Sequence, residues 1–317
     1  MIAIVGAGFY GCYIALTLAN KGHKVTLFDP LNTIESATLH CQARLHNGMF
    51  YIRSHKDLLS CARNFTKFFK VFKPYIYKDF NSYYLIDKNS KVDYDTYLRV
   101  CRNNHIKVEP VTLDYINKNS VQGIIKAKEF SIDTEGLLNN LRDLCYSHPN
   151  ITFYRTRVVS IINETPIVLQ TQEQNYYVAD KVILACYSDN FRLLSKLGLL
   201  SPNHTSNTMW VVMYNDNLPK DCHAVVDGNY WSSIVTPRGK LLTNSIPHNG
   251  KFFDNTTVQI KQYIPEFKPE YKGYATVKKT VLDNTREATI TKYGNIYSVF
   301  SGKLTNIFDI INQIEAL

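Results

Sequence analysis

The sequence lacks the patterns that mark several large classes of protein. Its seven cysteines stand far apart and include no C-x-x-C pair, which argues against a zinc site and a disulfide framework and favours a reducing compartment. No apolar run approaches the roughly 20 residues of a membrane span. The apolar start is not preceded by the basic segment of a signal peptide. We therefore expect a cytoplasmic protein with no membrane partner.

The chain also lacks a dense cluster of positive charge, although its formal net charge is +9. Its lysines and arginines are scattered, so we expect no nucleic-acid partner. The densest basic run, residues 63–78, places lysines at helical spacing between aromatics. That pattern predicts an amphipathic surface helix with its aromatics in the core; the alternative is a surface for an anionic ligand. A chain of 317 residues has room for one large domain or two smaller ones.

What the sequence does contain begins at its N-terminus. Residues 2–5 form an apolar run, as in a buried parallel strand, and Gly6, Gly8 and Gly11 follow as G-x-G-x-x-G. A helical pattern comes next, and then a second strand that ends at Asp29, 21 residues after Gly8. Strand, glycine turn, helix, strand and acidic residue at these spacings are typical of a dinucleotide-binding unit.

Each part of this motif has a physical role. Gly6 permits the tight turn, Gly8 lets backbone amides approach a pyrophosphate, and Gly11 lets the helix pack close to the strand. Asp29 is suited to accept hydrogen bonds from the hydroxyls of an adenosine ribose, and its charge disfavours the 2′-phosphate of NADP. The alternative is a structural glycine turn in another α/β fold.

A polar, irregular segment follows, over residues 30–54. A simple NAD-binding half would continue instead into a helix and a third parallel strand. Loops of this length inside compact domains are usually functional, or else their elements have been misassigned. The segment carries side chains and a glycine suited to line a ligand: Ser36, Thr38, Gln42, Arg44, His46, Asn47 and Gly48.

The C-terminal region repeats the strand, turn and helix arrangement. Residues 296–300 read as a strand, followed by a glycine-bearing turn and an amphipathic helix that Thr305 or Asn306 can cap. The N-terminus of that helix is suited to face an anionic or carbonyl-rich ligand. The alternative is a helix that only docks on the domain.

These segments resemble those of FAD-dependent oxidoreductases of the D-amino-acid oxidase and glycine oxidase superfamily. The resemblance is carried by "GAGFYG" with "FD", by "ATLHCQARLHNGMFY", and by residues 128–161, 179–190 and 283–314. The glycine fingerprint and the C-terminal "SGKLTN" are its most specific parts.

The resemblance implies an α/β fold with FAD as cofactor. A Rossmann-like FAD-binding domain, with a parallel sheet and helices, would comprise residues 1–74, 128–204 and 283–317. An antiparallel-sheet substrate domain would be built from insertions at 75–127 and 205–282. The implied cofactor-binding residues are Gly6, Gly8, Phe9, Tyr10, Gly11, Asp29, Arg44, Leu45, Gly48, Val158, Gly302, Lys303, Leu304 and Thr305.

The resemblance also suggests Arg286 and His46 as catalytic residues. Arg286 matches by position the arginine that holds a substrate carboxylate bidentately; the alternative is a surface arginine beside Glu287. His40 and Cys41 are possible points of covalent flavin attachment. We expect no metal, because the spacing of His40, Cys41 and His46 fits no common zinc pattern.

Two positions depart from the family pattern. Tyr187 stands where a glycine normally lies close to the cofactor, and Ser301 occupies a glycine position in the final motif. Both departures bear on the detailed geometry of the site.

The sequence thus predicts an FAD-dependent oxidoreductase that oxidises a CH–NH or CH–OH bond of a small amino acid, amine or hydroxy acid. Hydride would pass to flavin N5, and oxygen or another acceptor would reoxidise the flavin. The oligomeric state stays open. The alternatives are a flavin-dependent non-redox enzyme, such as a sugar-ring isomerase, and a non-catalytic FAD-binding protein.

Overall fold

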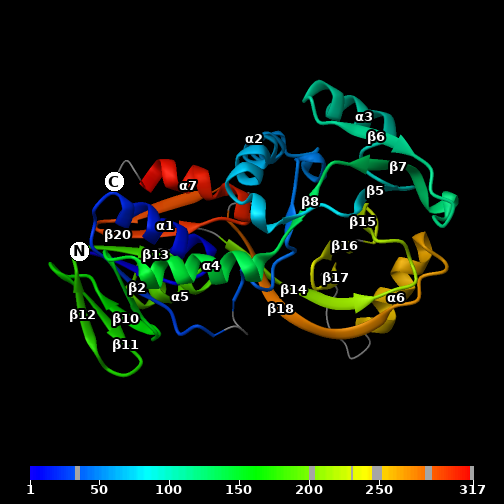
Figure 1. Cartoon of the computed structure of the whole chain (residues 1–317). Coiled ribbons are helices and arrows are strands. Elements are labelled where there is room, and N and C mark those ends of the chain that lie inside the picture. Colours follow the sequence, from blue (N-terminus) through cyan, green and yellow to red (C-terminus); the bar gives the residue numbers. More distant parts are fainter. Residues whose placement is uncertain (33–35, 200–203, 230, 245–251, 283–287, 315–317) are drawn as a thin grey trace. The chain divides into compact units, whose positions relative to one another are not determined.

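The computed structural model describes residues 1–32, 36–199, 204–229, 231–244, 252–282 and 288–314. The chain forms two compact units (Figure 1). Unit 1 comprises Met1–Leu39, Thr134–Ser206 and Lys278–Leu317, and unit 2 comprises His40–Asp133 and Asn207–Val277. Each unit is therefore assembled from segments far apart in the sequence.

A six-stranded sheet forms the centre of unit 1. Its strand order is β19 (Thr289–Tyr293), β20 (Ile296–Phe300), β13 (Lys181–Leu184), β1 (Ile2–Val5), β2 (Val25–Phe28) and β9 (Ile151–Tyr154). All neighbouring pairs are parallel except β19–β20. Because β1 lies between β13 and β2, the glycine turn that follows β1 emerges at the carboxyl edge of three parallel strands.

Helices and a second sheet enclose the sheet of unit 1. Helix α1 (Phe9–Asn20) packs against α4 (Thr134–Ser147) and α7 (Ile307–Ile314). Alternate residues of β1, Ala3 and Val5, instead pack with α5 (Asp189–Lys196) and an antiparallel sheet. That sheet consists of β10 (Val158–Ile162), β11 (Ile167–Thr171) and β12 (Tyr176–Ala179). The parallel sheet is thus buried on both faces.

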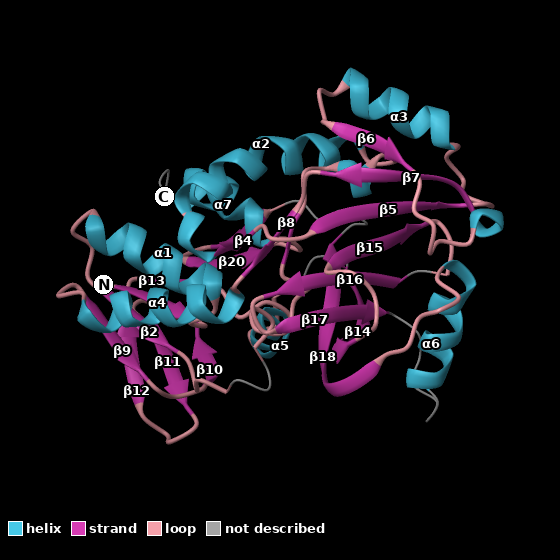
Figure 2. Cartoon of the chain, turned by 45° about the vertical axis from the view of Figure 1, so that its right-hand side comes forward, coloured by secondary structure: helices cyan, strands magenta, loops and turns pink. Residues whose placement is uncertain are grey.

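Unit 2 is built on an eight-stranded sheet (Figure 2). Its order is β18 (Glu270–Leu282), β14 (His204–Asn215), β17 (Gly239–Asn244), β16 (Trp231–Thr236), β15 (Asp221–Val226), β5 (Asn81–Asp87), β7 (Val121–Ala127) and β6 (Val108–Val111). From β14 to β6, neighbouring strands are antiparallel except for β15 and β5, which are parallel. A small sheet joins β3 (Arg44–Leu45), β8 (Phe130–Ile132) and β4 (Ile76–Tyr77).

Two hydrophobic cores lie on opposite faces of this large sheet. Along β5, Tyr83 and Leu85 belong to the core that includes α6 (Phe252–Tyr263). The alternate residues Tyr84 and Ile86 belong to the core that includes α3 (Tyr94–Asn103) and the short helix η1 (Met49–Tyr51). This alternation is the two-residue period of a strand buried on both sides.

The remaining helices of unit 2 include the basic segment identified in the sequence. Helix α2 (His55–Val71) confirms the predicted amphipathic helix for residues 63–71, with Phe68 fully buried and Phe65 stacked on Phe130. The prediction was wrong for the rest of the stretch, because the helix ends at Val71 and Ile76–Tyr77 form strand β4. Two short helices follow, η2 (Lys73–Tyr75) and η3 (Lys118–Ser120). Among the described helices, none combines the length and the apolar character needed to cross a membrane.

The predicted fold class is confirmed: a parallel-sheet α/β unit is joined to a unit built mainly of antiparallel strands. The predicted strands at 2–5 and 296–300 have those bounds in the structure. The compact units place residues 40–74 with the second unit, whereas the sequence assigned them to the FAD-binding domain by their expected contacts. Because compactness and ligand contact are different criteria, the functional boundaries stay a prediction.

Candidate functional site

Two glycines of the fingerprint are required by the backbone itself. Gly6 has φ +102°, and a Cβ there would lie 2.8 Å from the carbonyl oxygen of Ala185 on the neighbouring strand end. A Cβ on Gly11 would lie 1.7 Å from the carbonyl oxygen of Gly6. Side chains at these two positions would force the turn and α1 away from the sheet.

Gly8 differs from these two glycines, because neither its conformation nor its packing demands glycine. Its φ is −73°, and a Cβ would meet only the Thr38 hydroxyl oxygen, at 3.2 Å. Gly8 is the N-cap of α1 without a side-chain cap, and the next amide, of Phe9, donates to Thr38 Oγ1 at 3.1 Å. Space beside Gly8 at a helix N-terminus fits a pyrophosphate, so the residues present suit FAD.

Asp29 lies at the end of β2, beside the glycine turn. One carboxylate oxygen accepts from the amide of Ala7 at 2.7 Å, and the other accepts from the amide of Leu31 at 2.6 Å. Arg142 of α4 donates from Nε to the Ala7 carbonyl at 3.0 Å and brings Nη2 to 4.0 Å from Asp29. The acidic residue is therefore fixed on the turn by backbone donors and a partly buried guanidinium.

Sequence reasoning missed Arg142. The only available signal was its place on α4, next to the buried Leu141 and one turn after the buried Leu138. An arginine at the edge of an apolar stripe is usually a surface residue that covers apolar neighbours with its stem.

The C-terminal turn lies beside the N-terminal fingerprint within unit 1. The hydroxyl of Tyr10 donates to the carbonyl of Lys303 at 2.6 Å, across 293 residues of sequence. Burial raises the pKa of Tyr10 above its ordinary value, so this hydroxyl stays a neutral donor. The bond joins the two motifs that the resemblance had assigned to one cofactor.

The remaining predicted residues of this turn are Gly302, Leu304 and Thr305. Gly302 is exposed, Leu304 is half-buried, and Thr305 is buried in the 3-10 turn η4 (Leu304–Asn306) that precedes α7. Asn306 stands immediately before α7, where the sequence predicted a cap. Their contacts with FAD stay a prediction.

Both departures from the family pattern have a structural explanation. Tyr187 adopts φ 54°, the left-handed conformation that glycine adopts without strain, and its ring stacks on Phe300 at 5.1 Å between centroids. The Ser301 hydroxyl accepts from the amide of Lys303 at 3.3 Å and donates to its carbonyl at 3.1 Å. Ring stacking therefore holds one turn, and a serine side chain closes the other.

Val158, the predicted adenine contact, begins β10 and is 2% exposed. Its carbonyl accepts from Arg192 of α5 at 3.4 Å. The register of β10 with β11 is irregular between Val158 and Ser160. The predicted backbone contact with adenine stays a prediction.

The predicted residues of the 42–54 segment lie in unit 2. Arg44 and Leu45 form β3, paired with Ser131 and Phe130 of β8, and both are buried. Gly48 has φ +108°, and a Cβ there would lie 2.7 Å from the carbonyl oxygen of Leu58. Glycine is thus needed at this position for packing against α2.

The side chain of Arg44 is engaged within unit 2. Its guanidinium donates to Glu129 at 3.1 Å and to the hydroxyls of Ser82 and Ser232 at 3.2 Å each. It also donates to the Ser233 carbonyl. The guanidinium thus donates four hydrogen bonds to other residues of the protein. Its predicted contact with FAD stays a prediction.

Glu129 is the centre of this network, and sequence reasoning missed it. It accepts from Tyr84 at 2.7 Å, from the Asn47 amide at 3.2 Å, and from Nδ1 of His46 at 3.3 Å. Burial opposes its charge, but His46, Arg44 and Tyr84 outweigh burial and lower its pKa to about 2. No motif marks a lone acid between two strands, so only the fold could reveal it.

The ionised state of Glu129 fixes the tautomer of His46. A carboxylate only accepts hydrogen bonds, so the Nδ1 atom of His46 must carry a proton, and protonation changes occur at Nε2. The ring is also held edge-on against Tyr51, with centroids 5.5 Å apart. The second predicted catalytic residue, Arg286, lies outside the described residues.

Comparison with known proteins identifies the family of this chain. The family model described as FAD dependent oxidoreductase matches residues 1–265. The FAD-dependent monooxygenase FPY4 of Fusarium mangiferae is 24% identical, in an alignment that covers 100% of this chain and 90% of FPY4. The FAD-dependent monooxygenase kojA of Aspergillus flavus is 28% identical over 74% of this chain and 58% of its own length.

Solved structures show the same fold. Glycine oxidase from Geobacillus kaustophilus has a TM-score of 0.80 at 13% identity, covering 99% of this chain and 94% of that one. L-Proline dehydrogenase from P. horikoshii has a TM-score of 0.71 at 11% identity, covering 97% and 90%. The chain therefore belongs to the family of FAD dependent oxidoreductases, and it is an enzyme whose cofactor is FAD.

Proposed function

We propose that this enzyme oxidises a CH–NH or CH–OH bond of a small amino acid, amine or hydroxy acid. Bound FAD supplies the chemistry by accepting hydride at N5, and the protein binds, orients and handles protons. The names of structural neighbours, a glycine oxidase and an L-proline dehydrogenase, support a CH–NH substrate. The observation that carries the proposal is the His46–Glu129 pair, because a substrate that binds as an ammonium or a hydroxyl must lose a proton when hydride leaves its carbon.

Several residues near the glycine turn are proposed to hold FAD. The amides at the start of α1 and the open side of Gly8 suit the pyrophosphate, and Asp29 suits the ribose hydroxyls. The turn at Lys303, bound to Tyr10, is the proposed contact for the flavin end. These roles use groups that the fold already fixes, so little ordering accompanies binding.

His46 is the residue proposed to hold or release the proton. Glu129 keeps Nδ1 protonated and the ring oriented, and Arg44 keeps Glu129 ionised. Nε2 can therefore accept a proton from an ammonium or hydroxyl group and return it later. Glu129 acts through His46 and is a positioning residue.

The test of the reaction is anaerobic reduction of the bound flavin. The purified protein should be yellow, and glycine, L-proline or a 2-hydroxy acid should bleach its visible absorption, with imine or carbonyl product. Turnover without net oxidation, and only after prior reduction of the flavin, would support an isomerase instead. Incorporation of an oxygen atom from labelled dioxygen into the product would support a monooxygenase, the activity named for FPY4.

The role of His46 can be tested separately from folding. His46→Gln should lower kcat by about 10²–10⁴-fold, the range for loss of a general base. Glu129→Gln should shift the pH profile of kcat/KM, because the ring loses its charged partner. His55→Gln, at an exposed histidine at the start of α2, is the matched control. Unchanged kcat in His46→Gln, with native flavin absorption, would remove His46 from the mechanism.

A further inference from the structure

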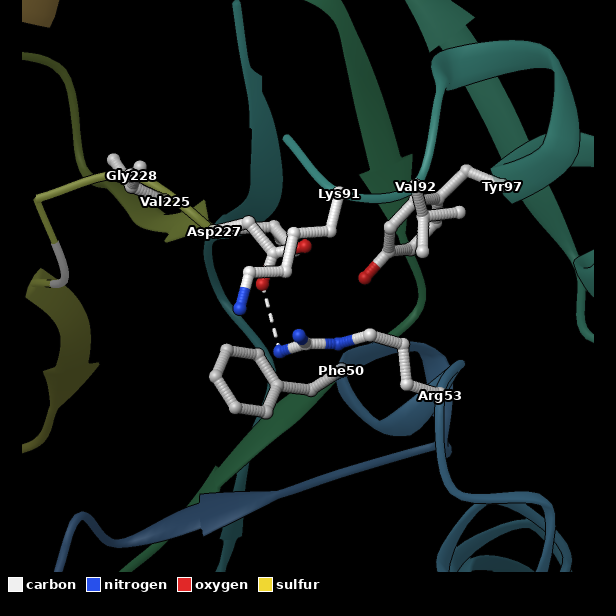
Figure 3. Close-up of a pocket in the computed structure, with 9 residues that line it drawn as sticks. Phe50, Arg53, Lys91, Val92, Tyr97, Val225, Asp227 and Gly228 are labelled. Atoms are coloured by element: carbon white, nitrogen blue, oxygen red, sulfur yellow. Dashed lines mark ion pairs between the residues drawn. The ribbon is translucent and has the colours of Figure 1, made fainter. Parts of the chain in front are cut away.

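Unit 2 contains a pocket of about 310 Å³ that the proposed redox roles do not use. Its walls come from η1, the loop that precedes α2, the residues from 91 to the middle of α3, and the end of β15 (Figure 3). All lining residues belong to one compact unit. The pocket is therefore defined by the fold of unit 2 alone, and its size suits a small molecule.

The hydroxyl of a buried tyrosine points into this pocket. Tyr97 of α3 is 2% exposed, and its side chain is directed into the space between Lys91 and Arg53 (Figure 3). Within the described parts of the chain its hydroxyl forms no hydrogen bond. Burial, with Asp227 nearby, raises the pKa of Tyr97 above its ordinary value, so the group is a neutral donor. Without a partner among the described residues, the hydroxyl is available to donate a hydrogen bond to a ligand in the pocket.

The charges around this hydroxyl favour an anion. Arg53 places Nη2 2.7 Å from Asp227 Oδ1, and the Ser90 hydroxyl donates to the other oxygen of Asp227 at 3.2 Å. The buried carboxylate of Asp227 is thus already satisfied. Lys91 adds a second positive charge to the lining, so two cations stand against one acid. Part of the guanidinium and the ammonium are left to attract a negative group.

The rest of the lining is apolar. Phe50, Val92 and Val225 contribute a ring and two branched side chains beside the charged groups (Figure 3). A phosphate or another multiply charged anion would bury its oxygens against these carbons without partners. A monocarboxylate with a short apolar or aromatic body instead matches both halves of the lining.

We propose that this pocket binds a small apolar monocarboxylate, with its carboxylate held by Tyr97, Arg53 and Lys91 and its body against Phe50. The Tyr97 hydroxyl donates one hydrogen bond to the carboxylate. Arg53 keeps its contact with Asp227 and offers its remaining N–H groups. This assignment does not depend on which bond the flavin oxidises.

The experiment is calorimetric titration of the FAD-loaded protein with phenylacetate and with its neutral analogue phenylacetamide. We expect one phenylacetate per chain and binding of the amide at least tenfold weaker. Tyr97→Phe should raise the Kd for phenylacetate about tenfold or more, because a hydrogen bond to a charged group is lost. Lys91→Gln should raise it several-fold and should not disturb folding, because Lys91 is exposed.

Arg99→Gln is the matched control, because Arg99 lies on the same helix and its side chain bonds to Thr96. It should leave the Kd for phenylacetate unchanged. The flavin spectrum and melting temperature of each variant report on folding. The proposal is overturned if phenylacetate does not bind at millimolar concentration, or if the amide binds equally well. It is also overturned if Tyr97→Phe and Lys91→Gln, both folded, bind phenylacetate as tightly as the wild type.

Discussion

The glycines of the fingerprint show how residues of one type serve different purposes within six positions. Gly6 and Gly11 are fixed by backbone contacts that a Cβ would violate, whereas Gly8 has an ordinary φ and a Cβ there would meet only a side-chain atom, the Thr38 hydroxyl oxygen at 3.2 Å. The first two glycines are therefore needed for folding, whether or not a cofactor is bound. Gly8 is proposed to serve the cofactor, because the absence of a side chain leaves the start of α1 accessible to a pyrophosphate.

This difference gives a prediction for two otherwise similar variants. Gly11→Ala should destabilise the flavin-free protein, at the upper end of about 1–3 kcal/mol, because the new Cβ meets the Gly6 carbonyl. Gly8→Ala should leave that stability nearly unchanged and reduce flavin retention. Denaturant unfolding of flavin-free protein, with flavin content after gel filtration, checks both. Equal loss of stability in the two variants would contradict the distinction.

Tyr187 offers a measurable case of backbone strain. At φ 54° a non-glycine residue carries a conformational penalty of about 1–2 kcal/mol, and stacking on Phe300 offsets it. Tyr187→Ala removes the ring and keeps the strain, whereas Tyr187→Gly removes both. We expect both variants to be less stable than the wild type, with the glycine variant more stable than the alanine variant by about 1 kcal/mol. The reverse order in urea unfolding would show that this turn is not strained.

At the scale of elements, one buried side chain links the start of α5 to the strands of unit 1. Asn190 is fully buried; its amide nitrogen donates to the carbonyls of Leu184 at 3.1 Å and Val299 at 2.8 Å. Its oxygen accepts from the Cys186 amide at 2.9 Å. The side chain thus closes the ends of β13 and β20 after their main-chain pairing stops.

Replacing Asn190 should therefore cost more than an ordinary hydrogen bond. Asn190→Ala leaves the carbonyls of Leu184 and Val299 and the half-buried amide of Cys186 without their partner, and each buried group left so costs about 1–3 kcal/mol. We expect unfolding free energy to fall by at least 3 kcal/mol, and amides near 186 to exchange hydrogen faster. Asn150→Ala, which removes a partly buried asparagine that donates to the Ala19 carbonyl, is the control. A loss below 1 kcal/mol for Asn190→Ala would mean that water replaces these bonds.

At the scale of the whole molecule, acid stability depends on a buried histidine in unit 2. His223 is 2% exposed, and its ring lies 3.0 Å from the Tyr115 hydroxyl. Burial, followed by the charges of Lys240 and Arg44, lowers its pKa to about 3 from 6.5. The folded chain therefore keeps this ring neutral at pH values where the unfolded chain protonates it.

The direction of the pH effect follows from this difference. Between pH about 6.5 and 3 the unfolded state binds a proton that the folded state does not, so stability is full above about 6.5 and falls below it. The expected slope is up to about 1.4 kcal/mol per pH unit from this one group. Unfolding at pH 8, 6 and 5 should show a shallower decline in His223→Phe. The exposed control His55→Gln should keep the wild-type slope.

Local sequence patterns predicted much of the fold of unit 1 and the two turns that are proposed to hold the cofactor. The glycine turn, the flanking strands and the C-terminal strand and turn could be predicted because their signals are short-range: apolar runs, glycine spacing and helix caps. The Tyr10–Lys303 bond then places the two predicted turns together. Ser301 and Tyr187 depart from the family motif in the sequence. The structure shows what stabilises the two turns instead, a side-chain hydrogen bond of Ser301 and the stacking of Tyr187 on Phe300, which a short motif does not reveal.

The rest was decided by tertiary structure, because it depends on residues brought together from distant segments. Arg142 bonds to the glycine turn from a helix 135 residues further along the chain. Glu129 contacts His46 because β3, which precedes His46, pairs with β8, which follows Glu129. The pocket around Tyr97 likewise combines three separate stretches of unit 2. Sequence alone determined that this chain builds a dinucleotide fold for FAD. Burial and long-range pairing, which only the tertiary structure decides, bring together the acid, the hydroxyl and the cations for which roles are proposed.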